Sequence, residues 1–243
     1  MTPRAKATPS VIDQLDALIF DVDGTLAETE EAHRLAFNEA FAEAGLDWDW
    51  TPDLYRELLK VTGGKERIAW FLAYPPGNLL EGLDADIDLF IRRLHGRKTE
   101  LYASRVAAGA VALRPGIEPL IREARRRRIQ LAIATTTSRP NVEALIGAAL
   151  GREILGWFDA VACGDMAALK KPAPDVYDLA LAALGVPAAR AVAIEDSWNG
   201  VRAAKAAGLT VIATPSLYSA NDDFTEADLV CEPHQIALRL GWS

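Results

Sequence analysis

The stretch that decides the fold is Leu18-Ile19-Phe20-Asp21-Val22-Asp23-Gly24-Thr25. Its three leading apolar residues are typical of a short buried strand, and two aspartates follow almost at once. Because residues two apart in an extended chain point to the same side, the side chains of Asp21 and Asp23 should emerge together where the strand ends. Gly24 then allows the backbone to turn sharply and leave the sheet. By itself, the segment would also fit a polar turn that closes a strand.

Further strands of the same sheet are expected at residues 129–134, 191–194 and, more weakly, 211–213, which are short apolar runs. Helical patterns lie around them, at residues 117–128, 141–150, 175–184 and 199–207. Strands that alternate with helices of this length predict an α/β fold, with a Rossmann-like, doubly wound parallel sheet as its core. Such sheets bind their ligands at the carboxyl ends of the strands.

A different pattern interrupts this alternation directly after the first strand. Residues 30–105 show few strand signals, and their apolar residues have helical spacing, as in Ala32, Ala36, Phe37, Ala40 and Phe41. Breaks are expected at Gly45, Gly63-Gly64 and Pro75-Pro76-Gly77. We therefore predict two domains, a catalytic core of residues 1–29 and 106–243 and an inserted helical domain of residues 30–105.

The composition narrows the classes of partner and compartment. A formal net charge of −8 argues against nucleic acid, whose phosphates are bound mainly by Lys and Arg. No apolar run approaches the roughly 20 residues that span a bilayer, and residues 1–14 lack the apolar core of a signal peptide. Cys163 and Cys231 are far apart and have no CxxC spacing, which fits a reducing compartment. We expect a cytoplasmic protein without membrane or nucleic-acid partners and, since no signal for an oligomer stands out, a monomer.

Acidic residues also follow a second strand. Glu195 and Asp196 come directly after the apolar run at residues 191–194, so they should reach the same edge of the sheet as Asp21 and Asp23. Four acidic groups at one edge would repel one another strongly unless a cation lies among them. Mg²⁺ is the natural candidate, because it prefers hard oxygen ligands such as carboxylates, waters and phosphate.

Two further positions suit a bound phosphate. Thr135 follows the strand at residues 129–134 and offers a hydroxyl, while Thr136, Thr137 and Ser138 offer backbone N–H groups ahead of a helix. Lys171, within Lys170-Lys171-Pro172-Ala173-Pro174-Asp175, places a positive charge near another helix start. A lone Thr or Lys is normally an ordinary surface residue. Each of these falls where a strand should end, and that coincidence favours a functional interpretation.

The ordered set of these motifs resembles that of the haloacid dehalogenase superfamily of hydrolases. The resemblance implies a Rossmann-like core with a helical cap over the active site. It also implies that Asp21 attacks phosphorus to form an aspartyl-phosphate and that Asp23 is the general acid and base. Thr135 and Lys171 would hold the transferring phosphoryl oxygens. Mg²⁺ would be bound by Asp21, Asp196 and the backbone carbonyl of Asp23, with Glu195 supporting it directly or through water.

A closer resemblance concerns the substrate. Glu28-Thr29-Glu30-Glu31-Ala32-His33, Thr62-Gly63-Gly64-Lys65-Glu66-Arg67, Leu113-Arg114-Pro115-Gly116 and Thr135-Thr136-Thr137-Ser138 together resemble the sugar-bisphosphate phosphatases of carbon-fixing organisms. Those enzymes act on xylulose-1,5-bisphosphate, so the resemblance implies a phosphorylated sugar as substrate. The residues that it would place at the substrate are Glu30, His33, Tyr55, Gly63, Gly64, Lys65, Glu66, Arg67, Arg97, Lys98, Thr136 and Ser138.

Other interpretations stay open at this point. The Gly-rich turn at residues 62–67 would also fit a helix start with solvated charges, and it lacks the GxxxxGK[ST] spacing of a P-loop. A β-phosphoglucomutase-like phosphomutase would share all the core motifs and the helical cap. A receiver-type signalling module also combines an acidic pocket with Mg²⁺, Thr and Lys on an α/β sheet. It is much shorter and has no cap, so the insert argues against it.

Overall fold

The computed structural model describes residues 14–73 and 86–242, and a six-stranded sheet lies at its centre. The strand order is β3-β2-β1-β4-β5-β6, and every pair is parallel. The strands are β1 (Ala17–Phe20), β2 (Gln130–Ala134), β3 (Ala160–Ala162), β4 (Ala191–Glu195), β5 (Thr210–Ala213) and β6 (Leu229–Val230). The predicted α/β, doubly wound parallel sheet is confirmed. The expected break at residues 75–77 lies outside the described residues.

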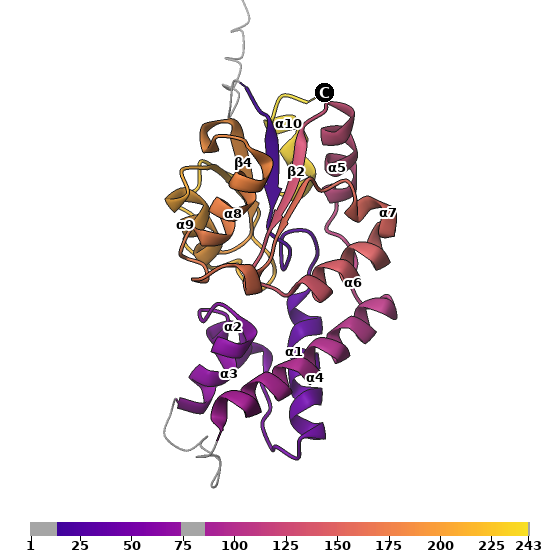
Figure 1. Cartoon of the computed structure of the whole chain (residues 1–243), viewed down its shortest axis with the longest axis vertical. Coiled ribbons are helices and arrows are strands. Elements are labelled where there is room, and N and C mark those ends of the chain that lie inside the picture. The colour runs from indigo at the N-terminus through magenta and orange to yellow at the C-terminus, as the bar shows by residue number, and fades with distance from the viewer. Residues whose placement is uncertain (1–13, 74–85, 243) are drawn as a thin grey trace, which may run out of the picture.

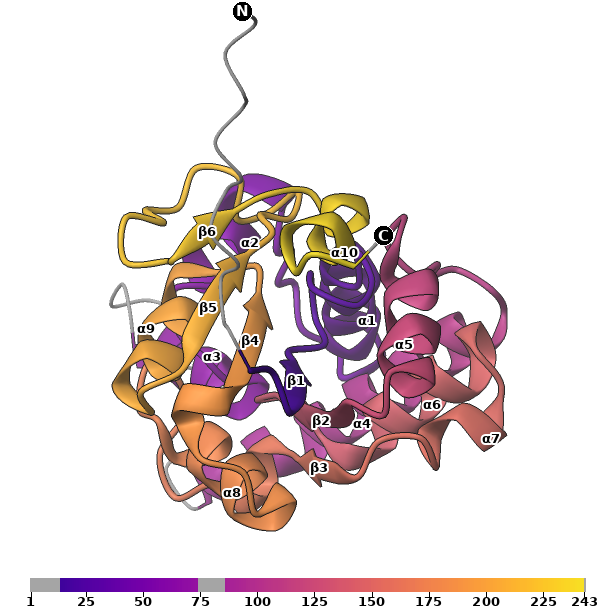
Figure 2. The same ribbon diagram turned by 90° about the horizontal axis from the view of Figure 1, so that it is seen from above.

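Helices cover both faces of the sheet, as Figure 2 shows. On one side lie α8 (Asp175–Leu184) and α9 (Trp198–Ala206), and on the other lie α5 (Ile117–Arg126), α6 (Arg139–Ala149), α7 (Arg152–Leu155) and α10 (Ile236–Arg239). Strand β1 shows why both faces are apolar, because its side chains alternate between the two hydrophobic clusters. Leu18 and Phe20 belong to one cluster, while Ala17 and Ile19 belong to the other.

Four helices follow β1 and lie at the end of the sheet where its strands finish (Figure 1). They are α1 (Glu30–Glu43), α2 (Pro52–Leu58), α3 (Gly64–Ala73) and α4 (Ile87–Ala107). Their interior is largely aromatic. The fully buried ring of Trp50 has its centroid 4.6 Å from that of Phe37 and 4.9 Å from that of Phe41. The division of the chain at residues 30 and 105 stays a prediction.

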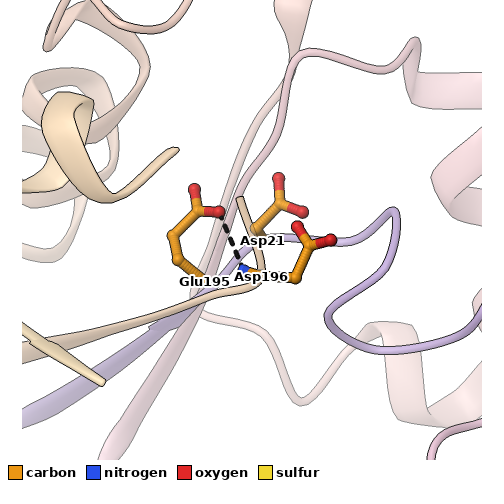
Figure 3. A group of neighbouring side chains, drawn as sticks. All are labelled: Asp21, Glu195 and Asp196. Atoms are coloured by element: carbon orange, nitrogen blue, oxygen red, sulfur yellow. Dashed lines mark hydrogen bonds between the residues drawn. The ribbon is translucent and has the colours of Figure 1, made fainter. Parts of the chain in front are cut away.

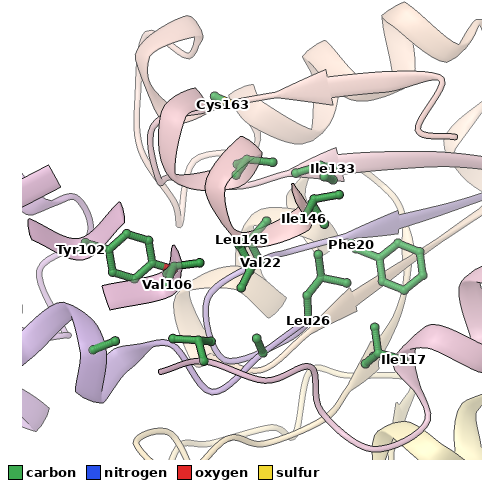
Figure 4. Close-up of a cluster of buried hydrophobic side chains, with 14 of the residues drawn as sticks. Phe20, Val22, Leu26, Tyr102, Val106, Ile117, Ile133, Leu145, Ile146 and Cys163 are labelled. Atoms are coloured by element: carbon green, nitrogen blue, oxygen red, sulfur yellow. The ribbon is translucent and has the colours of Figure 1, made fainter. Parts of the chain in front are cut away.

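These helices are not packed separately from the sheet. One hydrophobic cluster contains residues of both parts, and Figure 4 shows Tyr102 and Val106 of α4 in line with Val22, Leu145 and Phe20. We call α1 to α4 the cap, and α4 contacts both its cap neighbours α1 and α3 and the core helix α6. In the described part of the chain, no helix combines the length and the apolar character needed to cross a membrane.

The two β strands missing from the sequence-based prediction are the edge strands. β3 consists of Ala160, Val161 and Ala162, and β6 has only two residues, Leu229 and Val230. Runs this short give no periodic signal, since strand patterns need about four residues or more. They join the sheet because their neighbours β2 and β5 offer an unpaired backbone edge.

The sheet interior should dominate the stability of the fold. Leu131 of β2 is fully buried, so we expect Leu131→Ala to lower the free energy of unfolding by about 2–5 kcal/mol through lost burial and an added cavity. Leu238→Ala is the matched control, because Leu238 is 73% exposed and such a change usually stays within about 0.5 kcal/mol. Urea unfolding monitored by circular dichroism measures both, and equal losses would contradict this account of the core.

Candidate active site

Three carboxylates meet at the carboxyl ends of two neighbouring strands. Asp21 follows β1, Glu195 ends β4 and Asp196 follows it, and all three are buried. The parallel register pairs Phe20 with Ile194, which brings the residues after them side by side. One oxygen of each carboxylate lies within 4.8 Å of the others, and Figure 3 shows the three groups around one point. The predicted convergence of these residues is observed.

A buried ammonium group partly balances this charge. The Nζ of Lys171 donates to Asp21 Oδ1 at 2.7 Å, to Glu195 Oε1 at 2.6 Å and to the carbonyl oxygen of Ala134 at 3.0 Å. Burial alone would lower the pKa of Lys171, but the two carboxylates outweigh it and raise the pKa. Lys171 is therefore a permanent cation, and one cation faces three carboxylates.

The surplus negative charge fits a divalent metal ion. Burial raises the pKa of Asp21 to about 8, against the lowering effect of Lys171, and Glu195 raises it further. Burial and the neighbouring Asp21 and Glu195 also raise the pKa of Asp196. Such groups stay ionised at neutral pH when a cation lies among them. The donor set consists of hard carboxylate oxygens, which suits Mg²⁺.

Gly24 allows Asp196 to approach this point closely. At Gly24 the φ angle is +82°, and a Cβ there would lie 2.1 Å from Asp196 Oδ2. On its other side Asp196 is held by Ser219, whose Oγ lies 2.6 Å from the backbone oxygen of Asp196 and 3.1 Å from Oδ2. The glycine in the Asp21–Thr25 motif is therefore required both for the turn and for the space.

The side chain of Asp23 belongs to a separate network that runs into the cap. Its Oδ1 accepts hydrogen bonds from Thr29 Oγ1 at 2.6 Å and from His33 Nε2 at 3.0 Å. The Nδ1 of His33 lies 2.6 Å from Lys98 Nζ, and its ring stacks on Tyr102 with the centroids 3.8 Å apart. Because a protonated Lys98 can only donate, Nδ1 must accept, and the His33 proton lies on Nε2. The side chain of Asp23 is absent from the carboxylate cluster, and its expected role as a metal ligand through the backbone carbonyl stays a prediction.

This network has strong effects on the charges within it. Burial raises the pKa of Asp23, but His33 and Thr29 outweigh it and lower the pKa to about 2. Burial lowers the pKa of Lys98 to about 7, against the opposite effect of Asp23. Burial and the neighbouring Lys98 also lower the pKa of His33. The residues of the cap therefore control the protonation of Asp23.

A cavity of about 580 Å³ lies between the sheet edge and the helices α1 to α4. Most of the predicted site residues line it, namely Asp21, Asp23, Glu30, His33, Gly63, Gly64, Lys65, Glu66, Arg67, Lys98, Thr136, Ser138, Lys171 and Asp196. On the cap side its wall has mixed charge, with the basic residues Arg56, Lys60, Lys65, Arg67 and Lys98 and the acidic residues Glu30, Glu57 and Glu66. Lys65 and Asp165 of the core both line the cavity, and Lys65 Nζ lies 3.2 Å from Asp165 Oδ1.

Some predicted residues lie elsewhere. Arg97 is a correction, because it does not line this cavity and its guanidinium pairs with Glu43 at 2.5 Å and Glu100 at 2.7 Å on the outer face. Consecutive residues on a helix point about 100° apart, so Lys98 faces inward and Arg97 cannot. Tyr55 is fully buried behind the cavity wall, where its hydroxyl donates to Glu30 at 2.8 Å.

Thr135 and Glu195 also stand behind the lining residues. The Oγ1 of Thr135 accepts the backbone N–H of Thr137 at 3.2 Å, which shapes the loop after β2. Glu195 is fully buried and reaches the site through Lys171. Neither Thr135 nor Glu195 is among the residues that line the cavity.

Sequence reasoning missed several residues of the site, among them Thr29 beside Asp23, Ser219 beside Asp196, and Asp165 and Tyr177. Asp165 follows the short strand β3, which has no pattern of its own, so nothing in the sequence indicated its approach to Lys65. Tyr177 donates to Glu195 Oε1 at 2.5 Å. Its signal was weak but present, since it lies on the buried face of the helix that begins just after Lys171.

Comparison with known proteins agrees with this site. A family model described as haloacid dehalogenase-like hydrolase matches residues 15–208. Protein CbbY of Cereibacter sphaeroides is 55% identical over 214 residues, which cover 88% of this chain and 90% of that protein. Protein CbbY of Rhodobacter capsulatus is 52% identical over 215 residues, which cover 88% of this chain and 92% of that protein.

Solved structures give the same result. The crystal structure of CbbY from Rhodobacter sphaeroides in complex with phosphate has a TM-score of 0.87 and 51% identity, covering 94% of this chain and 100% of that chain. A mutant of the same protein in complex with xylulose-(1,5)bisphosphate has a TM-score of 0.84 and 53% identity, covering 90% and 94%. A β-phosphoglucomutase from Clostridium difficile, at 20% identity and a TM-score of 0.75, is similar in fold alone. With its four motifs gathered at one sheet edge, the chain belongs to the haloacid dehalogenase-like hydrolases.

Proposed function

We propose that this chain is a Mg²⁺-dependent phosphatase that removes one phosphate from a sugar bisphosphate, with xylulose-1,5-bisphosphate as the first candidate. The observation that carries the proposal is the contact of 2.7 Å between Lys171 Nζ and Asp21 Oδ1 beside two further carboxylates. In this arrangement the Lys171 ammonium group can contact both the nucleophile and a bound phosphoryl group. The CbbY mutant solved with xylulose-(1,5)bisphosphate, at 53% identity, supports the choice of substrate.

Asp21 is the nucleophile in this mechanism. A carboxylate oxygen of Asp21 bonds to phosphorus while the ester bond to the sugar oxygen breaks, and water later cleaves the aspartyl-phosphate. Lys171 and the backbone N–H groups of Thr136 and Ser138 stabilise the charge on the phosphoryl oxygens. Asp21, Asp196 and Glu195 would hold Mg²⁺, which supplies neutralisation of phosphoryl charge when bound.

Asp23 is the general acid and base. It lines the cavity, and the hydrogen bonds from Thr29 and His33 both go to Oδ1, which leaves Oδ2 for the sugar oxygen and then for water. With substrate bound, the negative charge of the phosphate opposes the lowering of the Asp23 pKa by His33 and Thr29, so that Asp23 can carry a proton. That proton moves to the leaving oxygen in the first half of the reaction and returns from water in the second. Because His33 lies on α1, its hydrogen bond ties the orientation of Asp23 to the position of that helix.

The cap supplies a second anion site opposite the first. Lys65, His95 and Lys98 line the cavity there, and Lys65 is 42% exposed with a single acidic partner in Asp165. Arg67 is engaged differently, because its guanidinium donates to the Leu58 carbonyl and to the Tyr55 hydroxyl. We infer that Lys65 meets the far phosphate of the substrate and that Asp165 competes for it.

The compartment is inferred from the cysteines. Cys163 and Cys231 are both buried and unpaired, as expected for a protein of the reducing cytoplasm.

Loss of the nucleophile should end turnover. We expect Asp21→Asn to lower kcat below the detection limit, since an amide does not attack phosphorus. Asp16→Asn is the matched control, because Asp16 precedes β1 and pairs with Arg190 on the surface. Phosphate release with Mg²⁺ is measured on xylulose-1,5-bisphosphate, ribulose-1,5-bisphosphate, fructose-1,6-bisphosphate and β-glucose-1-phosphate. Glucose-6-phosphate formed without free phosphate would instead indicate a phosphomutase.

Lys65 and Asp165, which form an ion pair at the second anion site, can each be substituted, and the two substitutions should change KM in opposite directions. We expect Lys65→Met to raise KM for the bisphosphate about tenfold or more, the effect of losing a charged hydrogen bond, and to change KM for a monophosphate little. Asp165→Asn should lower KM for the bisphosphate, because it frees Lys65 from its ion pair. Equal effects of Lys65→Met on both substrates would contradict the assignment.

The buried Lys98 should make stability depend on pH. Its pKa falls from 10.5 to about 7 on folding, so the unfolded chain binds more protons between these values. The contribution of Lys98 therefore improves stability as pH rises from 7 to 10.5. Lys98→Met removes it, so the variant's stability relative to wild type should fall over that range by on the order of a few kcal/mol.

Urea unfolding at several pH values measures this difference. Lys205→Met is the control, because Lys205 lies on the surface beside Asp228 at 2.8 Å. A difference between Lys98→Met and wild type that stays constant with pH would show that folding does not lower the pKa of Lys98.

A further inference from the structure

Tyr177 is a fully buried tyrosine on α8 that does not line the cavity. Its hydroxyl donates to Glu195 Oε1 at 2.5 Å, and Glu195 ends the strand that carries Asp196. Resting on the proposed function, we propose that Tyr177 is a positioning residue that orients Glu195 for Mg²⁺ and keeps Lys171 on the nucleophile. The hydroxyl acts from behind the site, without touching substrate.

Two donors hold the same oxygen of Glu195. Tyr177 and Lys171 both reach Oε1, the latter at 2.6 Å, while the backbone N–H of Asp196 reaches Oε2 at 3.2 Å. Gly200 closes the remaining side, where a Cβ would lie 1.9 Å from Oε2. Because Oε1 already accepts two hydrogen bonds, the carboxylate is held with Oε2 toward the backbone of Asp196.

The hydrogen bond from Tyr177 to Glu195 also affects how the Lys171 ammonium group is shared among its acceptors. Its ammonium group has three acceptors, Asp21, Glu195 and the Ala134 carbonyl, and lies 5.1 Å from the centre of the Tyr177 ring. A fully buried carboxylate needs donors for both oxygens. If the Tyr177 hydroxyl were absent, Oε1 would depend on Lys171 alone. The Glu195 carboxylate would then turn toward the ammonium group and draw it away from Asp21.

The test is Tyr177→Phe, which removes one oxygen and keeps the ring. Isothermal titration of the metal-free protein with Mg²⁺ should show a Kd about five- to tenfold higher than wild type, the scale of one lost hydrogen bond to a charged group. Steady-state kinetics should show a lower kcat with an unchanged KM, since Tyr177 does not face the substrate. Tyr102→Phe is the control for affinity, because it removes another buried phenol hydroxyl, one with no partner in the described chain, and should leave the Mg²⁺ Kd as it is.

A double-variant comparison separates positioning from a loss of folding. If Tyr177 acts through Glu195, adding Tyr177→Phe to Glu195→Gln should not weaken Mg²⁺ binding further. This comparison also holds where the single variant has a lowered melting temperature. An Mg²⁺ Kd equal to wild type in Tyr177→Phe, or a further loss in the double variant, would overturn the role of Tyr177. A wild-type protein that does not bind Mg²⁺ would overturn the proposed function itself.

Discussion

The buried Lys171 ammonium group is the interaction on which the rest of the site depends. Three carboxylates at one sheet edge repel one another, and burial in a low dielectric strengthens that repulsion. Lys171 contacts two of them and a strand carbonyl, so it holds the ends of β1, β2 and β4 in one place. It offsets only part of the charge, and under the proposed function the remaining negative charge would favour a divalent cation at this edge. Tyr177 then stabilises the carboxylate that Lys171 leaves only partly satisfied.

A second set of contacts ties catalysis to the cap. Asp23 is positioned by Thr29 and His33, and His33 in turn contacts Lys98 on α4. Asp23, the proposed acid and base, is therefore held by a network that reaches helices lining the opposite wall of the cavity. Lys65 and Asp165 join the two sides of the cavity. A ligand with two anionic ends would satisfy Lys171 at one end and Lys65 at the other, and in doing so would favour the closed arrangement in which Asp23 is oriented.

Much of the secondary structure and several site residues could be predicted from local sequence patterns. Apolar runs located β1, β2, β4 and β5 to within about one residue, and helix signals found α8 with both its ends. The edge strands β3 and β6 escaped, because two or three residues carry no period. On the cap, His33 and Lys98 were anticipated, whereas Arg97 was placed at the substrate and lies on the outer face. Neighbouring residues of one helix look alike in sequence, and only the packing of α4 against α1 decides which of them faces inward.

The sequence by itself determined the class of fold, the family and the chemistry at the sheet edge. It could do so because parallel strands bring their carboxyl ends together whatever the surrounding helices do, so acidic and hydroxyl residues after apolar runs must meet. Only the tertiary structure decided which side chains touch the cavity and which support it. Tyr55, Thr135 and Glu195 stand behind the surface, and Asp165 and Tyr177 enter the site from segments far along the chain. Those contacts depend on how whole helices pack against the sheet, and that packing is set by long-range burial which no local spacing records.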